Sequence, residues 1–355
     1  MVYYILSFFI LLLGLGSFQK TKGASLVYVV AVCAIIFVAG LKTQGSTDYF
    51  SYKNVYEYSS TEFSLDSSYE PGFLIFKNVC RSLNLSFILF YFLFACISIG
   101  SKAYVFKKLT PYAFPALLIY LCGLFFERDN DGIRQGMSIA FCFLSLYYMI
   151  EKNKKGSIIS YAIAVLFHYS SFVFAIALLF EKIRLKDKTI AITVMIFFVL
   201  CFIHLSFSNL LMTYLPTGVS LTKMEQYSNS EEYSAAMGIS IGLLFRMGIL
   251  MLFMKQRYKM DISERMYLVL RNGFALSIIM SLAFNDFIIL AHRLPYAFRE
   301  FQIFIVPYLF TSVKNQEKPI YLGVVWLYCC MLLYRFLNGD AAVVYNSYEN
   351  YLFSF

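Results

Sequence analysis

The sequence predicts an all-α, polytopic integral membrane protein. Three observations indicate this fold class: of the 355 residues 60% are hydrophobic, only 14% are charged, and the mean hydropathy is +0.66. A soluble core cannot bury that much apolar surface, so lipid is the expected solvent. We expect one transmembrane domain over residues 1–355, with roughly 11 to 12 helices that cross or enter the membrane.

Apolar segments recur along the whole chain. At about 1.5 Å per residue, each can cross or nearly cross ~30 Å of hydrocarbon as a helix. Barrel strands are not expected, because the segments lack period-two alternation and unpaired backbone groups are costly in lipid. No basic residue precedes the first segment and no small-residue cleavage pattern follows it, so it should stay as a span. The segments are 3–18, 24–41, 85–101, 112–126, 189–207, 237–254, 267–284 and 320–337.

The apolar stretch 157–180 decides the topology, because a polar run beginning at His168 interrupts it. Its length fits one tilted span, whereas a turn at His168 would make a hairpin of two short helices. The hairpin gathers most basic clusters on one side, as cytoplasmic loops require, and the single span does not. We therefore favour the hairpin, which puts Lys102 on the inner side and Asp129 on the outer side.

Two long polar connections, about 42–84 and 208–236, then face outward. The first is expected to contain an amphipathic interfacial helix from Pro71 to Leu83. The outer side also collects most of the acidic residues, so chemistry is expected there.

Charge and cysteine content exclude several classes of function. The net charge is +9, but the basic residues fall in short clusters between apolar segments, which indicates topology and not nucleic-acid binding. The eight cysteines form no CxxC pair and there are only three histidines, so neither a disulfide framework nor a Cys/His metal site is predicted. We expect no cofactor.

The densest polar run lies at 127–135, at the outer end of two spans. Arg128 and Arg134 could hold a diphosphate bidentately. Alternatively, Asp129 and Asp131 merely neutralise the arginines in a solvated loop. The two carboxylates also form a DxD triplet, which often binds a divalent ion, but the flanking arginines favour a metal-independent site.

Two further outer positions could carry chemistry. His168 could be a general base, a phosphate donor or only a helix breaker. Arg293, Tyr296 and Glu300 are predicted to lie near one helical face beside Arg299, where they could bind substrate or only snorkel to the interface.

The first outer connection combines carboxylates with aromatic rings. The carboxylates Asp48 and Glu70 occur there together with Tyr49 and Tyr52. This mixture suits sugars, whose hydroxyls need acceptors and whose ring faces stack on aromatics. The competing interpretation is the aromatic belt at the membrane surface.

Five short motifs follow one another over roughly 40–310. They are Gly45 to Tyr49 with Tyr52, Tyr69 to Phe73, Ile133 to Gln135, Phe167 to Ser170, and Arg293 with Tyr296. In their order and spacing the chain resembles the EpsG branch of the Wzy-type polysaccharide polymerases. Lys42 departs from the resemblance, since such proteins often carry Arg there, and Lys lacks the planar fork that binds phosphate bidentately.

The resemblance implies a GT-C-like glycosyltransferase of the bacterial inner membrane with its active site on the extracytoplasmic side. It would move a growing glycan from undecaprenyl diphosphate onto an incoming lipid-linked repeat unit. Expected partners are the undecaprenyl-diphosphate-linked oligosaccharide, membrane lipid, a chain-length regulator and a flippase. The alternative function is a flippase or transporter of lipid-linked oligosaccharide.

Such a transfer needs a general base for the acceptor hydroxyl and cations for the leaving diphosphate. The candidate bases, in order, are Glu70, Asp48 and His168. Arg134 is the first candidate for the diphosphate, with Arg128, Arg293 and Arg299 as helpers and with Tyr49, Tyr52 and Tyr296 as further substrate contacts.

Overall fold

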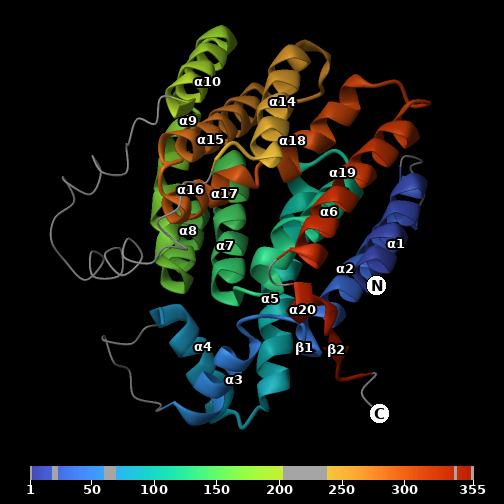
Figure 1. Ribbon diagram of the computed structural model, residues 1–355, viewed down its shortest axis with the longest axis vertical. Coiled ribbons are helices and arrows are strands. Elements are labelled where there is room, and N and C mark those ends of the chain that lie inside the picture. The colour runs from blue at the N-terminus through green and yellow to red at the C-terminus, as the bar shows by residue number, and fades with distance from the viewer. Residues whose placement is uncertain (1, 18–22, 60–68, 203–237, 340–341, 353–355) are drawn as a thin grey trace, which may run out of the picture. The chain divides into compact units, whose positions relative to one another are not determined.

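The computed structural model confirms the all-α class (Figure 1). It describes residues 2–17, 23–59, 69–202, 238–339 and 342–352, which contain 17 α-helices and one two-stranded sheet. The predicted connection at 208–236 lies outside these ranges. The chain divides into two compact units, Met1–Phe172 with Val306–Phe355 and Val173–Ile305.

The first unit contains most of the helices. They are α1 (Val2–Ser17), α2 (Ala24–Gly40), α3 (Tyr49–Tyr58), α4 (Pro71–Ser82), α5 (Phe87–Leu109), α6 (Ala113–Cys122), α7 (Ile133–Ile150), α8 (Lys154–Phe167), α19 (Lys318–Asn338) and α20 (Ala342–Asn346). Its remaining elements are the strands β1 (Lys42–Gln44) and β2 (Glu349–Asn350), the π-helix η1 (Phe125–Asp129) and the 3-10 helix η4 (Phe310–Ser312).

The second unit holds the elements between these two stretches. They are α9 (Ala177–Phe180), α10 (Asp187–Phe202), α14 (Ile241–Lys255), η3 (Arg257–Lys259), α15 (Glu264–Ala283), α16 (Ile288–Arg293) and α17 (Tyr296–Arg299). Two elements run across the division, η2 (Tyr169–Ile176) and α18 (Gln302–Leu309).

Four of the described helices are long and apolar enough to cross a membrane: α5, α7, α15 and α19. The shorter apolar helices α1, α2 and α6 add to them. Each predicted apolar segment is mainly helical where it is described. The protein is therefore a multi-pass membrane protein.

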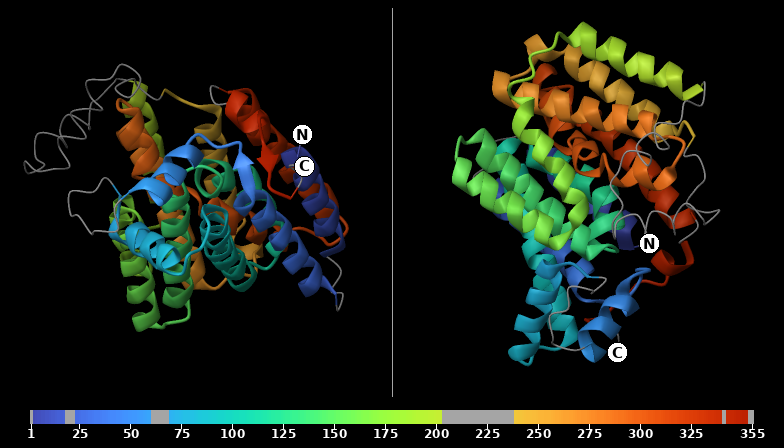
Figure 2. Two further views of the ribbon diagram at one scale, coloured as in Figure 1. Left: turned by 90° about the horizontal axis from the view of Figure 1, so that it is seen from below. Right: turned by 90° about the vertical axis from the view of Figure 1, so that its left-hand side faces the viewer.

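Within the first unit, α7 packs between α5 and α8 (Figures 1 and 2). On the other side of α5, α2 lies along it, and α1 contacts both α6 and α19. After α2, β1 pairs antiparallel with β2, and Gln44 donates to Glu349 at 2.9 Å. The C-terminal segment thereby fixes the chain just before α3.

The predicted amphipathic helix is present as α4. It begins with Pro71 after an extended Glu70, as expected at a first helical turn, and it buries Phe73 and Cys80 on one side. A Cβ on Gly72 would stand 2.8 Å from the backbone oxygen of Leu166 in α8. The missing side chain at this position therefore allows α4 to lie directly on the end of α8.

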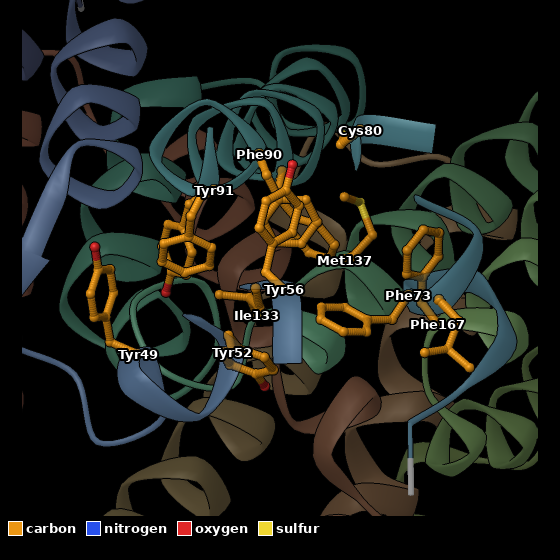
Figure 3. Packing of buried hydrophobic residues seen from close by; sticks show 13 residues of the cluster. Tyr49, Tyr52, Tyr56, Phe73, Cys80, Phe90, Tyr91, Ile133, Met137 and Phe167 are labelled. Carbon is orange, nitrogen blue, oxygen red and sulfur yellow. The ribbon is translucent and has the colours of Figure 1, made fainter. Parts of the chain in front are cut away.

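An aromatic cluster packs α3 and α4 onto α5 and α7 (Figure 3). The Phe73 ring centroid lies 5.6 Å from that of Tyr52 and 5.9 Å from that of Phe90, and Tyr56 stands 4.7 Å from Phe90. Offset and edge contacts of this kind stabilise beyond the area they bury. The helices α3 and α4 of the connection 42–84 are therefore packed against the rest of the first unit.

The hairpin interpretation of 157–180 agrees with the structure. The helix α8 ends at Phe167, and His168 takes an extended conformation with φ −161° and ψ 124°. Four residues later the chain has folded back, since Tyr161 donates its hydroxyl to the Phe172 carbonyl at 3.0 Å. A straight helix would separate these two residues by about 16 Å.

The placement of Lys102 and Asp129 on opposite sides is wrong, because the two form a buried ion pair at 2.8 Å. Lys102 lies two turns inside α5, which continues to Leu109. Its ammonium also donates to the Gly136 carbonyl at 2.7 Å. Ser98 donates to the Asp129 carboxylate at 2.5 Å, and Tyr120 does so at 2.8 Å.

An ion pair with a buried arginine joins two helices of the other unit. Arg271 in α15 is 1% exposed and lies 2.5 Å from Asp187 at the start of α10. Beside it, Asn272 donates to the carbonyls of Phe180 and Ile183, both at 2.8 Å. An arginine inside an apolar span usually faces a partner or a cavity, and Arg271 has Asp187 as its partner.

We expect Gly72→Ala to lower the stability of the protein by about 1–3 kcal/mol, because the methyl group must push α4 away from α8. Gly100→Ala is the matched control, since nothing lies within 4 Å of a Cβ at that helical position. Thermal unfolding of the two purified variants in detergent measures the difference. Equal midpoints would contradict the close packing.

We expect Lys102→Met to destabilise by about 3–5 kcal/mol, because it leaves the Asp129 charge buried without its cation. Lys108→Met, on the exposed side of the same helix, should change stability by less than about 1 kcal/mol. The unfolding midpoints report both. In the double variant Lys102→Met/Asp129→Asn much of the loss should be recovered, and purely additive losses would contradict the ion pair.

Candidate functional site

Polar side chains from four separate helix ends gather in the first unit. Asp48 immediately precedes α3, Glu70 precedes α4, Arg134 lies in the first turn of α7, and His168 follows α8. Helix ends are favourable places for polar side chains, because the backbone groups there are not all paired within the helix. Together with Tyr52 and Gln135 these residues form what we term the polar cluster.

Arg134 stands at the centre of the polar cluster. Its guanidinium is hydrogen-bonded to Glu70 and lies 5.9 Å from the ring centroid of Tyr52. The ring centroid of Tyr69 lies 4.6 Å from it, so the cation is stacked as well as paired. Its Nε–H is buried and finds no acceptor among the described residues, whereas the side chain as a whole keeps 22% exposure. The guanidinium therefore retains capacity for another acceptor.

Glu70 links Arg134 to His168. Its carboxylate is mostly buried, and one oxygen lies 3.8 Å from His168 Nε2. The same ring nitrogen lies 2.8 Å from the carboxamide of Gln135. On the other side of the ring, Nδ1 lies 3.1 Å from the backbone N–H of Ser170 and 2.8 Å from its hydroxyl.

Asp48 is the half-buried carboxylate of the cluster. Burial raises the pKa of Asp48 above its usual value, and the nearby negative charge of Asp131 raises it further. Arg134 and a hydrogen bond to Tyr52 oppose that rise in pKa. A carboxylate with a raised pKa is a better proton acceptor than an ordinary one.

Asp131 fixes the chain that carries Asp48. Its carboxylate accepts from the Thr47 backbone N–H at 2.7 Å, from the Asp48 N–H at 3.1 Å and from the Ser46 hydroxyl at 3.1 Å. Tyr345 of the C-terminal segment donates to it at 3.2 Å. These bonds join the turn after η1 to the start of α3.

The two carboxylates of the DxD triplet thus have separate protein partners. Asp129 is held by Lys102, and Asp131 by the segment before α3. Among the residues that the structure describes, no group of three or more His, Cys, Asp or Glu side chains is placed to hold a metal ion. The solvated-loop alternative fits no better, since Asp129 and Asn130 are buried.

Lys42 fixes the turn after η1. Its ammonium is fully buried and donates to both the backbone and the side-chain oxygen of Asn130. Burial lowers the pKa of Lys42 to about 7, against the opposing effect of Asp131. A cation without exposure cannot reach a diphosphate, so Lys42 positions the turn and does not bind phosphate.

The predicted tyrosines have different surroundings. Tyr49 is 5% exposed and packs against Phe87, with ring centroids 5.3 Å apart, and Tyr52 is 2% exposed. Tyr69 is half-buried and lies over Arg134. In this structure Tyr49 packs in the core and Tyr52 orients Arg134, so substrate contact by either stays a prediction.

The remaining candidates are Arg128, Arg293 and Arg299. Arg128 is half-buried and 3.8 Å from its neighbour Glu127. Arg299 belongs to the second unit, where it donates to Glu300 at 3.0 Å and stacks on Tyr296 at 4.1 Å. Arg293 is exposed at the end of α16.

The expectation that Arg293, Tyr296 and Glu300 lie near one helical face is wrong. Proline removes a helical hydrogen bond and kinks or breaks a helix, and α16 stops at Arg293 before Pro295. A new helix, α17, begins at Tyr296 and ends at Arg299. Arg293 therefore does not share a helix with the other two residues.

Sequence reasoning assigned no role to Gln135 or Ser170. Both lie inside the short motifs that carried the resemblance, next to Arg134 and His168. That adjacency was the available signal, but only the fold shows that both side chains bind the same imidazole.

Comparison with known proteins gives one clear match. The family described as EpsG matches residues 25–353, which is nearly the whole chain. Neither a curated protein nor a solved structure matches it. The matched stretch includes every residue of the polar cluster. The chain therefore belongs to the EpsG family, which is linked to exopolysaccharide biosynthesis.

Proposed function

We propose that this protein is a glycosyltransferase that polymerises lipid-linked oligosaccharide repeat units. It would transfer a growing glycan from undecaprenyl diphosphate to an incoming lipid-linked repeat on the extracytoplasmic face of the membrane. One observation carries the proposal: Asp48, Glu70, Arg134 and His168, spread over the sequence, meet at helix ends of a membrane protein.

Arg134 suits the leaving lipid diphosphate. Negative charge develops on that group as the glycosidic bond breaks, and a fixed guanidinium stabilises it most when it is oriented in advance. Glu70 and the rings of Tyr52 and Tyr69 orient Arg134, whose side chain keeps 22% exposure. A diphosphate oxygen is an acceptor that a guanidinium binds.

Asp48 suits the general base better than Glu70 does. The Glu70 carboxylate is already engaged by the guanidinium of Arg134. Asp48 is half-buried with a raised pKa and has no such ion pair within the described residues. We therefore assign proton removal from the acceptor hydroxyl to Asp48, and the placement of Arg134 to Glu70.

The experiment uses the purified protein in liposomes that contain a lipid-linked repeat unit. Glycans longer than one repeat, resolved by electrophoresis, support polymerisation. Movement of the lipid-linked unit across the bilayer without longer products would instead identify a flippase. In cells lacking the protein, single repeats should accumulate on the lipid carrier, and loss of those repeats would contradict the proposal.

We expect Arg134→Lys to reduce polymer formation by about 100-fold or more at normal protein level, because lysine keeps the charge but not the planar fork. Arg81→Lys in α4 is the control, since Arg81 binds the Ser59 carbonyl outside the polar cluster. Product length and membrane protein content are measured together. Wild-type polymer from Arg134→Lys would remove Arg134 from the mechanism.

We expect polymerisation to fail as the pH falls through the raised pKa of Asp48, since a protonated carboxyl cannot accept a proton. Asp131→Asn removes the negative charge that raises this pKa, so the acid limb should move to lower pH. Tyr345→Phe breaks a bond to Asp131 without changing charge and should not move it. An unshifted limb in Asp131→Asn would show that another group is the base.

A further inference from the structure

The C-terminal segment, residues 342–352, packs against the chain that leads into the proposed base. It contains α20 and β2, and Figure 1 shows β2 beside β1. Gln44 pairs with Glu349 in this antiparallel sheet, and the Tyr351 N–H donates to the Leu41 carbonyl at 2.7 Å. The proposed base follows shortly after β1, so the segment contacts the chain just ahead of it.

Two side chains of this segment bind the end of α2. The Tyr348 hydroxyl donates to the Val38 carbonyl at 3.0 Å, and the Asn350 amide donates to the Phe37 carbonyl at 3.2 Å. Both carbonyls lie in the last turn of α2, where carbonyls commonly accept from groups outside the helix. The same amide donates to the Tyr348 hydroxyl at 2.7 Å and accepts from the Leu352 N–H at 3.0 Å. Every donor in this set therefore meets an acceptor.

The backbone turns where it leaves β1, and this turn also contacts the segment. Gly45 has φ +99°, a left-handed conformation that glycine adopts without strain. A Cβ at this position would lie 3.0 Å from the Cα of Tyr348. Glycine is the residue with the greatest backbone freedom. The contact therefore restricts the point at which the chain before Asp48 could bend most easily.

The segment also reaches the residue that binds the chain around Asp48. Tyr345 of α20 donates its hydroxyl to Asp131 at 3.2 Å. Asp131 in turn accepts from the backbone N–H groups of Thr47 and Asp48. A two-stranded sheet is only marginally stable by itself, so β1 and β2 need these additional bonds to stay together.

We propose that the C-terminal segment belongs to the transferase site, with Tyr348 and Asn350 as positioning residues that hold the Asp48 carboxylate against the acceptor hydroxyl. This role rests on the proposed function. A general base acts only within hydrogen-bond reach of the proton that it removes, and a displacement of about 1 Å can cost about 100-fold in rate. Both residues act through the chain that carries Asp48 and not by contact with the substrate.

We expect Asn350→Ala to lower the polymerisation rate about tenfold or more while KM for the lipid-linked repeat stays within about twofold, because the base moves and the diphosphate site does not. Asn338→Ala is the matched control, since Asn338 donates only within its own helix, to the Tyr334 carbonyl, and should keep the wild-type rate. Rates are taken per folded protein, measured by size exclusion. An equal loss in both variants, or a change in KM alone, would overturn the proposal.

A disulfide tests whether the position of the segment causes the defect. Gln44 and Glu349 lie opposite each other with their side chains in contact, and such paired residues are close enough for a disulfide. In Asn350→Ala carrying Gln44→Cys and Glu349→Cys, oxidation of the two thiols by copper phenanthroline should restore the rate to within about threefold of wild type. Reduction by dithiothreitol should remove the gain.

The control for this rescue is Asn350→Ala without the added cysteines. Its rate should respond to neither reagent, so an effect of oxidation on the native cysteines would be visible there. A protein that is crosslinked, as shown by its mass, and still polymerises slowly would contradict the positioning role.

The crosslinking rate reports on the segment without any activity and separates this inference from the function on which it rests. The cysteine pair should close faster when Asn350 is present than in Asn350→Ala, and equal rates would show that Asn350 does not hold the segment. If wild-type protein forms no polymer, the proposed function fails whatever the crosslinking shows. If polymer forms and Asn350→Ala polymerises like the wild type, the polymerase stands and the positioning role is wrong.

Discussion

The buried charge of Asp129 constrains the first unit more than any other single interaction. An uncompensated carboxylate at this depth would cost several kcal/mol, so the surrounding helices must supply partners. Lys102, Ser98 and Tyr120 all turn toward it, and Lys102 also binds the Gly136 carbonyl at the start of α7. The wider turn of η1 brings the carboxylate back to these groups, and π-helical turns often lie beside functional sites.

The residues that follow Asp129 are also fixed by side-chain hydrogen bonds. Asn130 accepts from the ammonium of Lys42, and Asp131 accepts from the backbone N–H of Thr47, just before α3. Arg134 follows one turn later and reaches Glu70, whose helix rests on α8 through Gly72. The polar cluster is thus held by rigid helix ends and not by a free loop. Such preorganisation is what electrostatic stabilisation of a leaving group requires.

The charged residues of this region have two different roles. Lys42 and Lys102 are buried and position the turn, so neither can bind a ligand. Arg134 keeps 22% exposure, and Asp48 keeps a raised pKa. The proposed transferase therefore uses few charged groups directly, while others fix where those groups stand. This arrangement also limits the number of charges that face a low-dielectric surrounding.

The amino-acid sequence by itself determined the membrane class, the helices, the break at His168 and most of the polar cluster. These depend on local properties, namely apolar length, proline position and polar interruptions, which need no knowledge of distant contacts. Only the tertiary structure decided that Lys102 meets Asp129, that Asp131 binds the segment before α3 and that Gln135 reaches the imidazole of His168. Those pairings join residues far apart in the chain, and the cost of burying an unpaired charge or donor selects them only when the helices pack.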